Sequence, residues 1–378
     1  MTDADPTITR VRAMTIKHQL RTPIYYGQWV MRHREFALIR LDTSAGVSGF
    51  AYCLTRDGPI AAIVERSIAP VYEGESARDP QSVFLRCLWT NHAVHAAGIG
   101  MRALSVVDIA AWDAAAKLAG QPMTRFLGGE PRRLPATAIV GYPPDISAEE
   151  LATQIRELRA AGWRRFKVPI SPDVEQSVER LFAAREAAPD DWLGFDINMV
   201  FRSVEQVLEF ERRVRELKLG WIEDVLPPGD AGAVAAVRER SETPIAVGDE
   251  QGGSYYPEAL LAAGAVDVLR VDATTDGGIT RLRDVIARAD QAGVPVAPHM
   301  FPHVHSQVAA ALTTVDTPIE WGIPGTGVHP MDDGLTQPLV ADGFMDPLPE
   351  APGLGQLVDL EWISEQAHED PQGLLADL

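Results

Sequence analysis

Five short apolar runs, each carrying a polar residue at or near its end, follow one another in the second half of the chain: LGFDIN (193–198), GWIED (220–224), PIAVGDE (244–250), VLRVD (268–272) and VPVAPH (294–299). Steps of 27, 26, 23 and 27 residues separate Asp196, Glu223, Asp249, Asp272 and His299. Each step fits one strand, one helix and two connections, so the repeat predicts a β/α barrel. The strand ends of such a barrel converge on one mouth, where polar groups are typical of chemistry.

The composition bounds the possible partners. The chain has 378 residues, 46% hydrophobic and 23% charged, as is usual for a globular protein. Its net charge of −19 argues against nucleic acid or an anionic membrane, because both require clustered positive charge. An anionic small molecule stays possible, since a metal ion reverses the local field. Two cysteines, a polar N-terminus and no long apolar run lead us to expect a cytoplasmic protein.

Residues 1–132 are predicted to form a small α+β unit. Apolar and polar residues alternate from residue 8 to about 52, which indicates strands. The period becomes helical from about 59 to 127. The strongest helical pattern is Ala103–Gly120, in which Ser105 is a candidate N-cap and the final glycine a terminator.

Residues 133–325 alternate strand and helix patterns. Eight strands are expected between about 136 and 322, with helices such as SAEELATQIRELRAAG between them. The predicted fold class is therefore α/β: a modified TIM barrel of the (β/α)7β type with an N-terminal α+β capping domain. Residues 326–378 are rich in glycine and proline and are expected to pack back on the capping domain.

Three carboxylates end three successive predicted strands: Asp196, Glu223 and Asp249. Brought together without a counter-charge, they would repel one another and some would protonate. A divalent cation removes this problem, and all-oxygen ligation favours Mg²⁺, with Mn²⁺ as the alternative. Glu250 competes with Asp249 as the third ligand, because strand side chains alternate and only one of the two can point inward. The plain alternative is that each is a solvated loop carboxylate or a helix N-cap.

A histidine and an aspartate end the next two strands. Neighbouring strands place Asp272 beside His299, and a carboxylate next to an imidazole fixes its tautomer and raises its pKa, which suits a general base. His299 belongs to the cluster PHMFPHVH, in which His303 or His305 could instead be the functional residue. The position directly after an apolar run favours His299, although a purely structural histidine competes with this interpretation.

Two further charged residues occupy strand ends. Lys167, in RRFKVPI, could bind a carboxylate or act as a base, although an isolated lysine is usually a surface residue. Glu320, which ends the eighth strand, could donate a hydrogen bond if protonated, or simply stay solvated.

Taken in order, these segments resemble the enolase superfamily, and within it the mandelate racemase branch. The resemblance spans nearly the whole chain, through MRALSVVDIAAWDAAAKLAGQPMTRFLGG, FKVP, FDINMVF, WIEDVLPP, VGDE, RVDATTDGGIT, APH and IEW. It implies that Asp196, Glu223 and Asp249 are metal ligands and that His299 with Asp272 is a catalytic dyad. It also implies that Glu320 is the electrophilic group on a substrate carboxylate.

One departure from that branch bears on the reaction. Mandelate racemase carries a Lys-x-Lys pair at the end of the second strand, with the second lysine as an opposing base. Here the motif reads Lys167-Val168-Pro169, and proline cannot transfer a proton. A β-hydroxy acid needs no second carbon base, because His299 can remove the α-proton and then protonate the departing hydroxyl. We therefore expect a lyase, an acid-sugar dehydratase that forms a 2-keto-3-deoxy acid.

Candidate substrate-binding residues come from the cap and from the first and third barrel strands. The segment YYGQW mixes aromatic and hydrogen-bonding groups, and from it we select Tyr26 and Trp29; Asn198 and Tyr142 join them. Tyr142 could also reach the face opposite His299. A racemase, epimerase or cycloisomerase and a non-catalytic sugar-acid binder remain alternatives, and relatives with this fold imply a homo-oligomer that acts on a small carboxylate.

Overall fold

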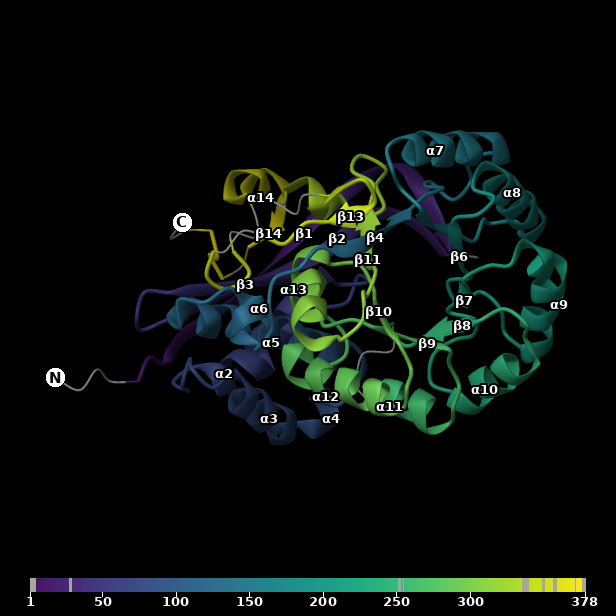
Figure 1. Ribbon diagram of the computed structural model, residues 1–378. Helices are drawn as coiled ribbons and strands as arrows, with labels where there is room; N and C mark the ends of the chain where they lie inside the picture. The colour runs from purple at the N-terminus through teal and green to yellow at the C-terminus, as the bar shows by residue number, and fades with distance from the viewer. Residues whose placement is uncertain are drawn as a thin grey trace.

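The computed structural model describes residues 5–26, 29–250, 253, 255–334, 340–348, 351–355, 359–370 and 372–375. In this part of the chain, no helix combines the length and the apolar character that crossing a membrane would need. A ring of strands and helices fills one half of the molecule, and the N-terminal sheet with its helices lies beside it (Figure 1).

The N-terminal unit begins with three antiparallel strands, β1 (Ile8–Tyr26), β2 (Trp29–Thr43) and β3 (Ser48–Leu54). Their apolar–polar alternation predicted strands here, and the first hairpin extends to the pairing of Tyr26 with Trp29. The helical segments then follow: α1 (Ile60–Ile63), a π-helical turn (Val64–Ile68), α2 (Ala69–Tyr72), α3 (Pro80–Thr90), α4 (His92–His95), α5 (Gly98–Leu118) and α6 (Met123–Phe126).

Helix α5 begins earlier than the sequence pattern suggested, so the predicted cap at Ser105 was wrong. Ser105 lies inside the helix, where its hydroxyl donates to the carbonyl of Met101 at 2.7 Å. A serine in a helix interior is tolerated when it bonds to the carbonyl four residues earlier. The same hydroxyl accepts from the backbone N–H of Gly277 at 2.9 Å, so it joins the two units instead of ending a helix.

The described part of the barrel alternates eight parallel strands with seven helices, which confirms the predicted (β/α)7β pattern (Figure 1). The strands are β4 (Leu134–Ile139), β5 (Arg165–Pro169), β6 (Trp192–Asp196), β7 (Trp221–Glu223), β8 (Ile245–Val247), β9 (Val268–Val271), β10 (Val296–Pro298) and β11 (Ile319–Gly322). They pair in chain order from β4 to β10, and β11 returns to pair with β4. The helices are α7 (Ala148–Ala160), α8 (Val174–Ala187), α9 (Val204–Val214) with a 3₁₀ turn (Arg215–Leu217), α10 (Ala231–Arg240), α11 (Tyr255–Ala262), α12 (Gly278–Gln291) and α13 (Pro302–Leu312).

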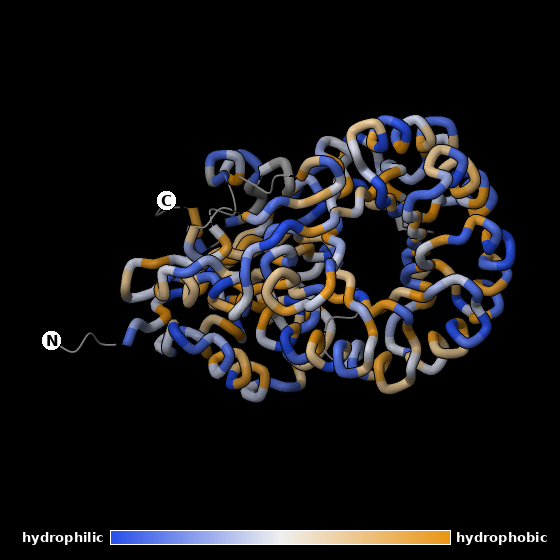
Figure 2. Tube along the Cα trace, viewed as in Figure 1, coloured by the Kyte–Doolittle hydropathy of each residue, from blue (hydrophilic) through white to orange (hydrophobic). Residues whose placement is uncertain are grey.

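Alternation along the strands separates the helix-facing core from the charged barrel interior. On β5, Phe166 and Val168 are buried in the main hydrophobic core, whereas Lys167 between them lies among charged groups. The surrounding helices bury only one face: α9 buries Val207, Phe210 and Val214, and hydropathy alternates along the helices in Figure 2. The barrel interior is thereby left to polar side chains near the strand ends.

The C-terminal segment contacts both units. It contains a 3₁₀ turn (Pro330–Gly334), β12 (Val340–Ala341), β13 (Phe344–Met345), α14 (Leu360–Gln366) and β14 (Ala367–Glu369). Strand β13 pairs with β4 of the barrel, and β14 adds to the edge of the N-terminal sheet beside β1. The backbone N–H of Leu354 also donates to Asp113 of α5 at 2.7 Å.

A buried polar contact fixes the cap on the barrel. Asp108 of α5 accepts from the backbone N–H of Thr280 at 2.9 Å and from its hydroxyl at 2.7 Å, in the first turn of α12. Trp112 donates to the same hydroxyl at 2.9 Å. Burial raises the pKa of Asp108 to about 7, against the opposing effect of these hydrogen bonds. The cap is therefore held by a helix-capping carboxyl supplied from another domain.

Candidate active site at the barrel mouth

The carboxyl ends of neighbouring strands bring the predicted acidic residues together. Asp196 and Glu223 are directly paired in register at the ends of β6 and β7. Carboxylate oxygens of Asp196, Glu223 and Asp224 lie within 4.8 Å of one another, a spacing that suits a shared cation. Two of the predicted ligands, Asp196 and Glu223, therefore lie in a group with the spacing of a cation site, and its third member is Asp224 and not Asp249.

Asp249 has two buried oxygens that accept no hydrogen bond from the described residues. Its nearest cations are Arg270, with Nη2 at 3.5 Å from Oδ2, and His299, with Nδ1 at 3.7 Å from the same oxygen. Buried carboxylate oxygens are nearly always satisfied, so a fully buried pair without a donor fits a ligand that the protein itself does not supply. The donor set of carboxylate oxygens suits a hard divalent ion.

Asp224 is a further acidic residue at this cluster, which the sequence did not indicate. Strict alternation after Glu223 would turn its side chain away from the interior. The backbone of Asp224 has φ 50°, however, and this left-handed conformation breaks the alternation. Burial, followed by the charges of Asp249 and Asp196, raises the pKa of Asp224 well above its ordinary value.

Glu250, the alternative third ligand, pairs with the capping domain. Its carboxylate forms a salt bridge with Arg56 in the loop after β3, and another with Arg102 of α5 at 3.2 Å. Although burial opposes ionisation, these two arginines hold the pKa of Glu250 well below its usual range. Adjacent residues thus face different partners, with Glu250 joined to the cap and Asp249 directed to the interior.

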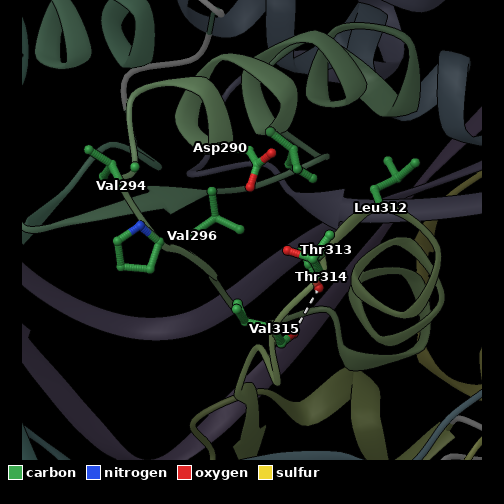
Figure 3. A pocket seen from close by; sticks show the side chains of 10 residues that line it. Asp290, Val294, Val296, Leu312, Thr313, Thr314 and Val315 are labelled. Atoms are coloured by element: carbon green, nitrogen blue, oxygen red, sulfur yellow. Dashed lines mark hydrogen bonds between the residues drawn. The ribbon is translucent and has the colours of Figure 1, made fainter.

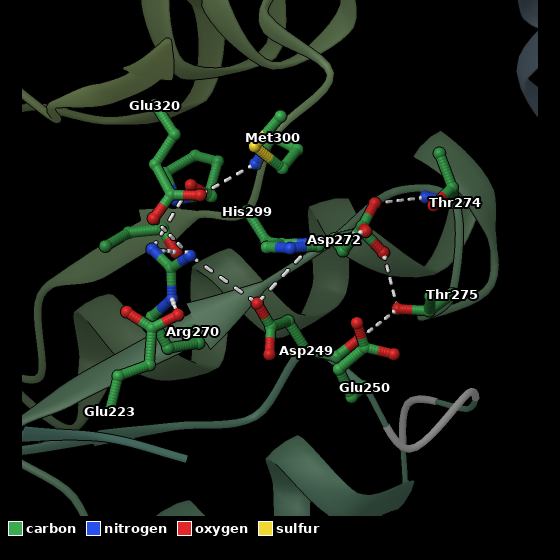
Figure 4. Close-up of polar contacts among 12 residues, drawn as sticks. Glu223, Asp249, Glu250, Arg270, Asp272, Thr274, Thr275, His299, Met300 and Glu320 are labelled. Atoms are coloured by element: carbon green, nitrogen blue, oxygen red, sulfur yellow. Dashed lines mark hydrogen bonds and ion pairs between the residues drawn. The ribbon is translucent and has the colours of Figure 1, made fainter. Parts of the chain in front are cut away.

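Asp272 and His299 face each other across neighbouring strand ends (Figure 4). His299 Nδ1 lies 3.1 Å from Asp272 Oδ2, and the other oxygen of Asp272 accepts from the backbone N–H of Thr274 at 2.7 Å. Burial alone would lower the pKa of His299, but the charges of Asp249 and Asp272 outweigh it and raise the pKa to about 9. This pair has the geometry of an oriented general base.

The other two histidines of PHMFPHVH have different surroundings. His305 is fully buried: Nδ1 lies 2.7 Å from the carbonyl of Met300, and Nε2 accepts from the backbone N–H of Ala273 at 2.9 Å. His303 stacks on Tyr52 with 4.8 Å between ring centroids. Only His299 of the three therefore pairs with a carboxylate at hydrogen-bond distance within the described residues.

Lys167 and Glu320 form an ion pair in the barrel interior, next to the strand-end carboxylates. Lys167 Nζ lies 2.6 Å from Glu320 and 2.9 Å from Glu223, so this lysine is buried and ion-paired rather than exposed. Glu320 also accepts from Arg270 at 2.7 Å and from the backbone N–H of Met300 at 3.0 Å. Burial opposes its ionisation, but Arg270 and Lys167 lower the pKa of Glu320 to about 2. Glu320 thus accepts from three donors here, and its role as the electrophilic group on a substrate carboxylate stays a prediction.

The candidate substrate-binding residues are placed unevenly. Tyr142 is buried in the loop after β4, which Arg180 of α8 holds by donating to the carbonyls of Gly141 and Pro144 at 2.7 and 2.6 Å. Asn198 donates its backbone N–H to Asp196 at 2.8 Å, and its side-chain nitrogen is buried with no partner among the described residues. The side chains of Tyr26 and Trp29, at the tip of the first hairpin, lie outside the described residues.

A separate pocket lies between α12 and α13 (Figure 3). Its lining is mainly apolar and includes Ile286, Val294, Val296 and Leu312, with Asp290 as its one acidic residue. The lining residues before β10 place this pocket at the amino ends of the strands. Residues at that end of a barrel serve stability rather than chemistry, so the strand-end carboxylates remain the candidate active site.

Comparison with known proteins gives similarity along nearly the entire chain. It is 29% identical to D-galactarolactone cycloisomerase of Agrobacterium fabrum, covering 96% of this chain and 100% of that protein. It is 28% identical to L-talarate/galactarate dehydratase of Salmonella typhimurium, covering 70% of this chain and 66% of that protein. The solved L-talarate dehydratase of Polaromonas sp. JS666, complexed with Mg and L-glucarate, superimposes with a TM-score of 0.85 at 25% identity, covering 96% of this chain and 98% of that one.

Two family profiles match in the order that the fold requires. Residues 8–128 match the mandelate racemase / muconate lactonizing enzyme N-terminal domain, and residues 150–362 match the enolase C-terminal domain-like family. The matched regions cover β1 to β3 with the helices that follow them, and the barrel from α7 onward, which carries the carboxylates and the Asp272–His299 pair. The chain therefore belongs to the mandelate racemase / muconate lactonizing enzyme family of the enolase superfamily.

Proposed function

We propose that this protein is a Mg²⁺-dependent acid-sugar dehydratase that removes water from a β-hydroxy carboxylate to give a 2-keto-3-deoxy acid. The observation that carries the proposal is the Asp272–His299 dyad at the mouth, together with Pro169 at the position of the racemase's second lysine. The dehydratase relatives, and a neighbour whose structure holds Mg and L-glucarate, support this substrate class.

Asp196, Glu223 and Asp249 are the residues that would hold Mg²⁺. Asp249 is chosen over Glu250 because its two buried oxygens accept no hydrogen bond from the described residues, whereas Glu250 is paired with two arginines. Asp224 has a carboxylate oxygen within 4.8 Å of those of Asp196 and Glu223, so it is a further candidate ligand. When bound, the ion would act as a Lewis acid that stabilises the charge developing on the substrate carboxylate.

His299 performs both proton transfers in this proposal. Asp272 accepts from Nδ1, which leaves Nε2 as the nitrogen that takes the α-proton. The same imidazolium then returns its proton to the departing β-hydroxyl, so no second carbon base is needed. Lys167 is positioned by Glu223 and Glu320 to orient the substrate carboxylate. Glu320, which accepts from three donors, positions this lysine rather than donating a proton.

A screen of aldonic and aldaric acids, beginning with galactarate, L-talarate and glucarate, tests the proposal. In the presence of Mg²⁺, at least one acid should lose water and yield a 2-keto acid, and chelation should abolish the reaction. In D₂O the product should carry deuterium at C3, while recovered substrate should show no inversion at C2. Inverted substrate without keto acid would refute dehydration and point to Tyr142 or Lys167 as a second base.

Cycloisomerisation is the second candidate, because the cycloisomerase relative matches along its full length. A lactone opened by elimination would use the same α-proton abstraction by His299, but the leaving group would be the ring oxygen. The two reactions differ in the mass of the organic product. Dehydration gives a product about 18 Da lighter than the substrate because one water is lost by proton abstraction and elimination. Ring opening leaves the mass unchanged. Mass spectrometry of reactions with galactarolactone and with galactarate therefore separates the two candidates.

A further inference from the structure

Arg270 lies in the barrel interior, in contact with the carboxylates at the strand ends. The proposed reaction assigns no role to this residue. It is a fully buried arginine on β9, two residues before Asp272. Burying a guanidinium costs several kcal/mol of desolvation unless charged partners and hydrogen bonds surround it. Its partners therefore indicate why the chain retains a charge there.

The guanidinium contacts three carboxylates from three strands (Figure 4). Nη2 lies 2.7 Å from Glu320 and 3.5 Å from Asp249, and Nε lies 3.2 Å from Glu223. Its Cζ is 5.4 Å from the ring centroid of Trp221, whose indole N–H donates to Glu223 at 3.0 Å. Arg270 is thus a counter-ion that two proposed metal ligands share with Glu320, in addition to Lys167, which contacts Glu223 and Glu320.

The same side chain also holds the backbone on both sides of His299. Nη1 donates to the carbonyls of Ala297 and Pro298 at 3.1 and 3.2 Å, immediately before the histidine. Glu320, which Arg270 holds with its other nitrogen, accepts from the backbone N–H of Met300, immediately after it. One rigid, planar group therefore spans β7, β9, β10 and β11.

We propose that Arg270 is the positioning residue of this site: it keeps His299 in register with Glu320 and the metal-binding carboxylates, and in the metal-free protein it is a counter-ion beside Lys167. The inference rests on the proposed function for its effect on turnover. Its effect on metal binding and on stability is independent of the substrate. Arg270 thereby links the proposed metal ligands Glu223 and Asp249 to the backbone that carries His299.

The substrate-independent test compares Arg270→Met with wild type at pH 8. Without a metal, the variant should unfold at a lower temperature, because three buried carboxylates lose their shared cation. Mg²⁺ should bind roughly tenfold more tightly by calorimetry, since a positive charge a few ångströms away opposes a divalent ion even at an effective dielectric constant of about 20. Mg²⁺ should accordingly raise its unfolding temperature by more than in wild type.

Arg165→Met is the matched control. Arg165 is an arginine on β5 placed two residues before Lys167, as Arg270 is placed before Asp272. It lies over Trp192 at 4.1 Å from the ring centroid and donates to Thr137 at 3.3 Å, and among the described residues it pairs with no carboxylate. Its loss should leave the Mg²⁺ dissociation constant within about twofold of wild type, because it pairs with none of the described carboxylates.

Turnover of the acid found in the screen completes the test. Arg270→Met should lower kcat roughly 100-fold with KM within about threefold, since supporting contacts to active-site ligands typically carry effects of 10–100-fold. Unchanged or weaker Mg²⁺ binding, or a kcat equal to that of Arg165→Met, would overturn the inference. If Arg270→Met does not fold, Arg270→Lys is used to test the inference. Lysine keeps the positive charge but lacks the planar guanidinium with its several donors, so Mg²⁺ affinity should stay within about threefold of wild type while kcat falls. Should no acid react with wild type, the proposed function fails, and the metal and stability measurements still decide the role of Arg270.

Discussion

His305→Phe should damage this protein more than His303→Phe, although the two histidines lie two residues apart on one helix. Phenylalanine keeps the ring and removes both nitrogens in each case. His305 bridges the backbone carbonyl of Met300 and the backbone N–H of Ala273, the residues that follow His299 and Asp272. Burial lowers the pKa of His305, so the neutral ring donates from Nδ1 and accepts at Nε2.

The magnitude follows from the groups left without partners. Removing the imidazole of His305 strands one buried C=O and one buried N–H, each at about 1–3 kcal/mol, so the free energy of unfolding should fall by about 4 kcal/mol. His303 makes one long contact, 3.3 Å from Nδ1 to the hydroxyl of Tyr52, and its Nε2 has no partner among the described residues. Its replacement keeps the stacking on Tyr52 and should cost about 1 kcal/mol or less.

Urea unfolding of the two variants, with kcat and Mg²⁺ affinity measured beside it, checks this reasoning. His305→Phe should lower kcat about 10–100-fold, because both halves of the dyad lose a supporting contact. Mg²⁺ affinity should be unchanged, since His305 contacts none of the proposed ligands. If the two variants lose equal amounts of unfolding free energy, or if His303→Phe loses more, then the hydrogen bonds of these buried rings do not determine how much each histidine contributes to stability.

The remaining predictions concern the dyad, the metal ligands and the domain contact. His299→Asn should lower kcat by about 10²–10⁴, and Asp272→Asn should also be severely impaired; normal turnover by the first variant would exclude His299 as the base. Asp249→Asn should weaken Mg²⁺ binding in calorimetry more than Glu250→Gln, and the reverse order would move the third ligand. Asp108 has a folded pKa of about 7 against an ordinary 3.8, so its protonated form stabilises the protein below about pH 4 and this stability is lost as the pH rises to about 7. Asp108→Asn should remove up to about 4 kcal/mol of that dependence in urea unfolding between pH 4 and 8, and parallel curves for variant and wild type would contradict it.

The sequence was most informative where a residue's role depends on its place along one strand. Asp196, Glu223 and Asp272 follow apolar runs at steps of one strand and one helix, so their convergence could be predicted before any contact was known. Asp224 could not, because its inward direction depends on a left-handed backbone at one residue. Arg270 resembled an ordinary polar position within VLRVD, since no local pattern reveals that three distant carboxylates surround it.

Neighbouring candidates show the same limit. In the pattern GDE the sequence left Glu250 competing with Asp249, and the contacts that distinguish the two come from Arg56 and Arg102, which are 194 and 148 residues away from Glu250 in the chain. In the cluster PHMFPHVH the sequence favoured His299 without excluding His303 and His305, and the contacts of the three rings, with β9 packed beside β10, place only His299 at hydrogen-bond distance from a described carboxylate, that of Asp272. Ion-pair partners of this kind are set by the closure of the barrel and the docking of the cap.

The sequence by itself determined the (β/α)7β barrel with its cap and the set of polar residues at one mouth, because hydrophobic periodicity is a local property that records which face of each element is buried. Tertiary structure alone decided which charge neutralises which, and therefore that Glu320 is an acceptor and Lys167 a buried ion-pair partner. The physical reason is that a buried charge is stabilised by whichever groups the completed fold places within a few ångströms, irrespective of their separation along the chain.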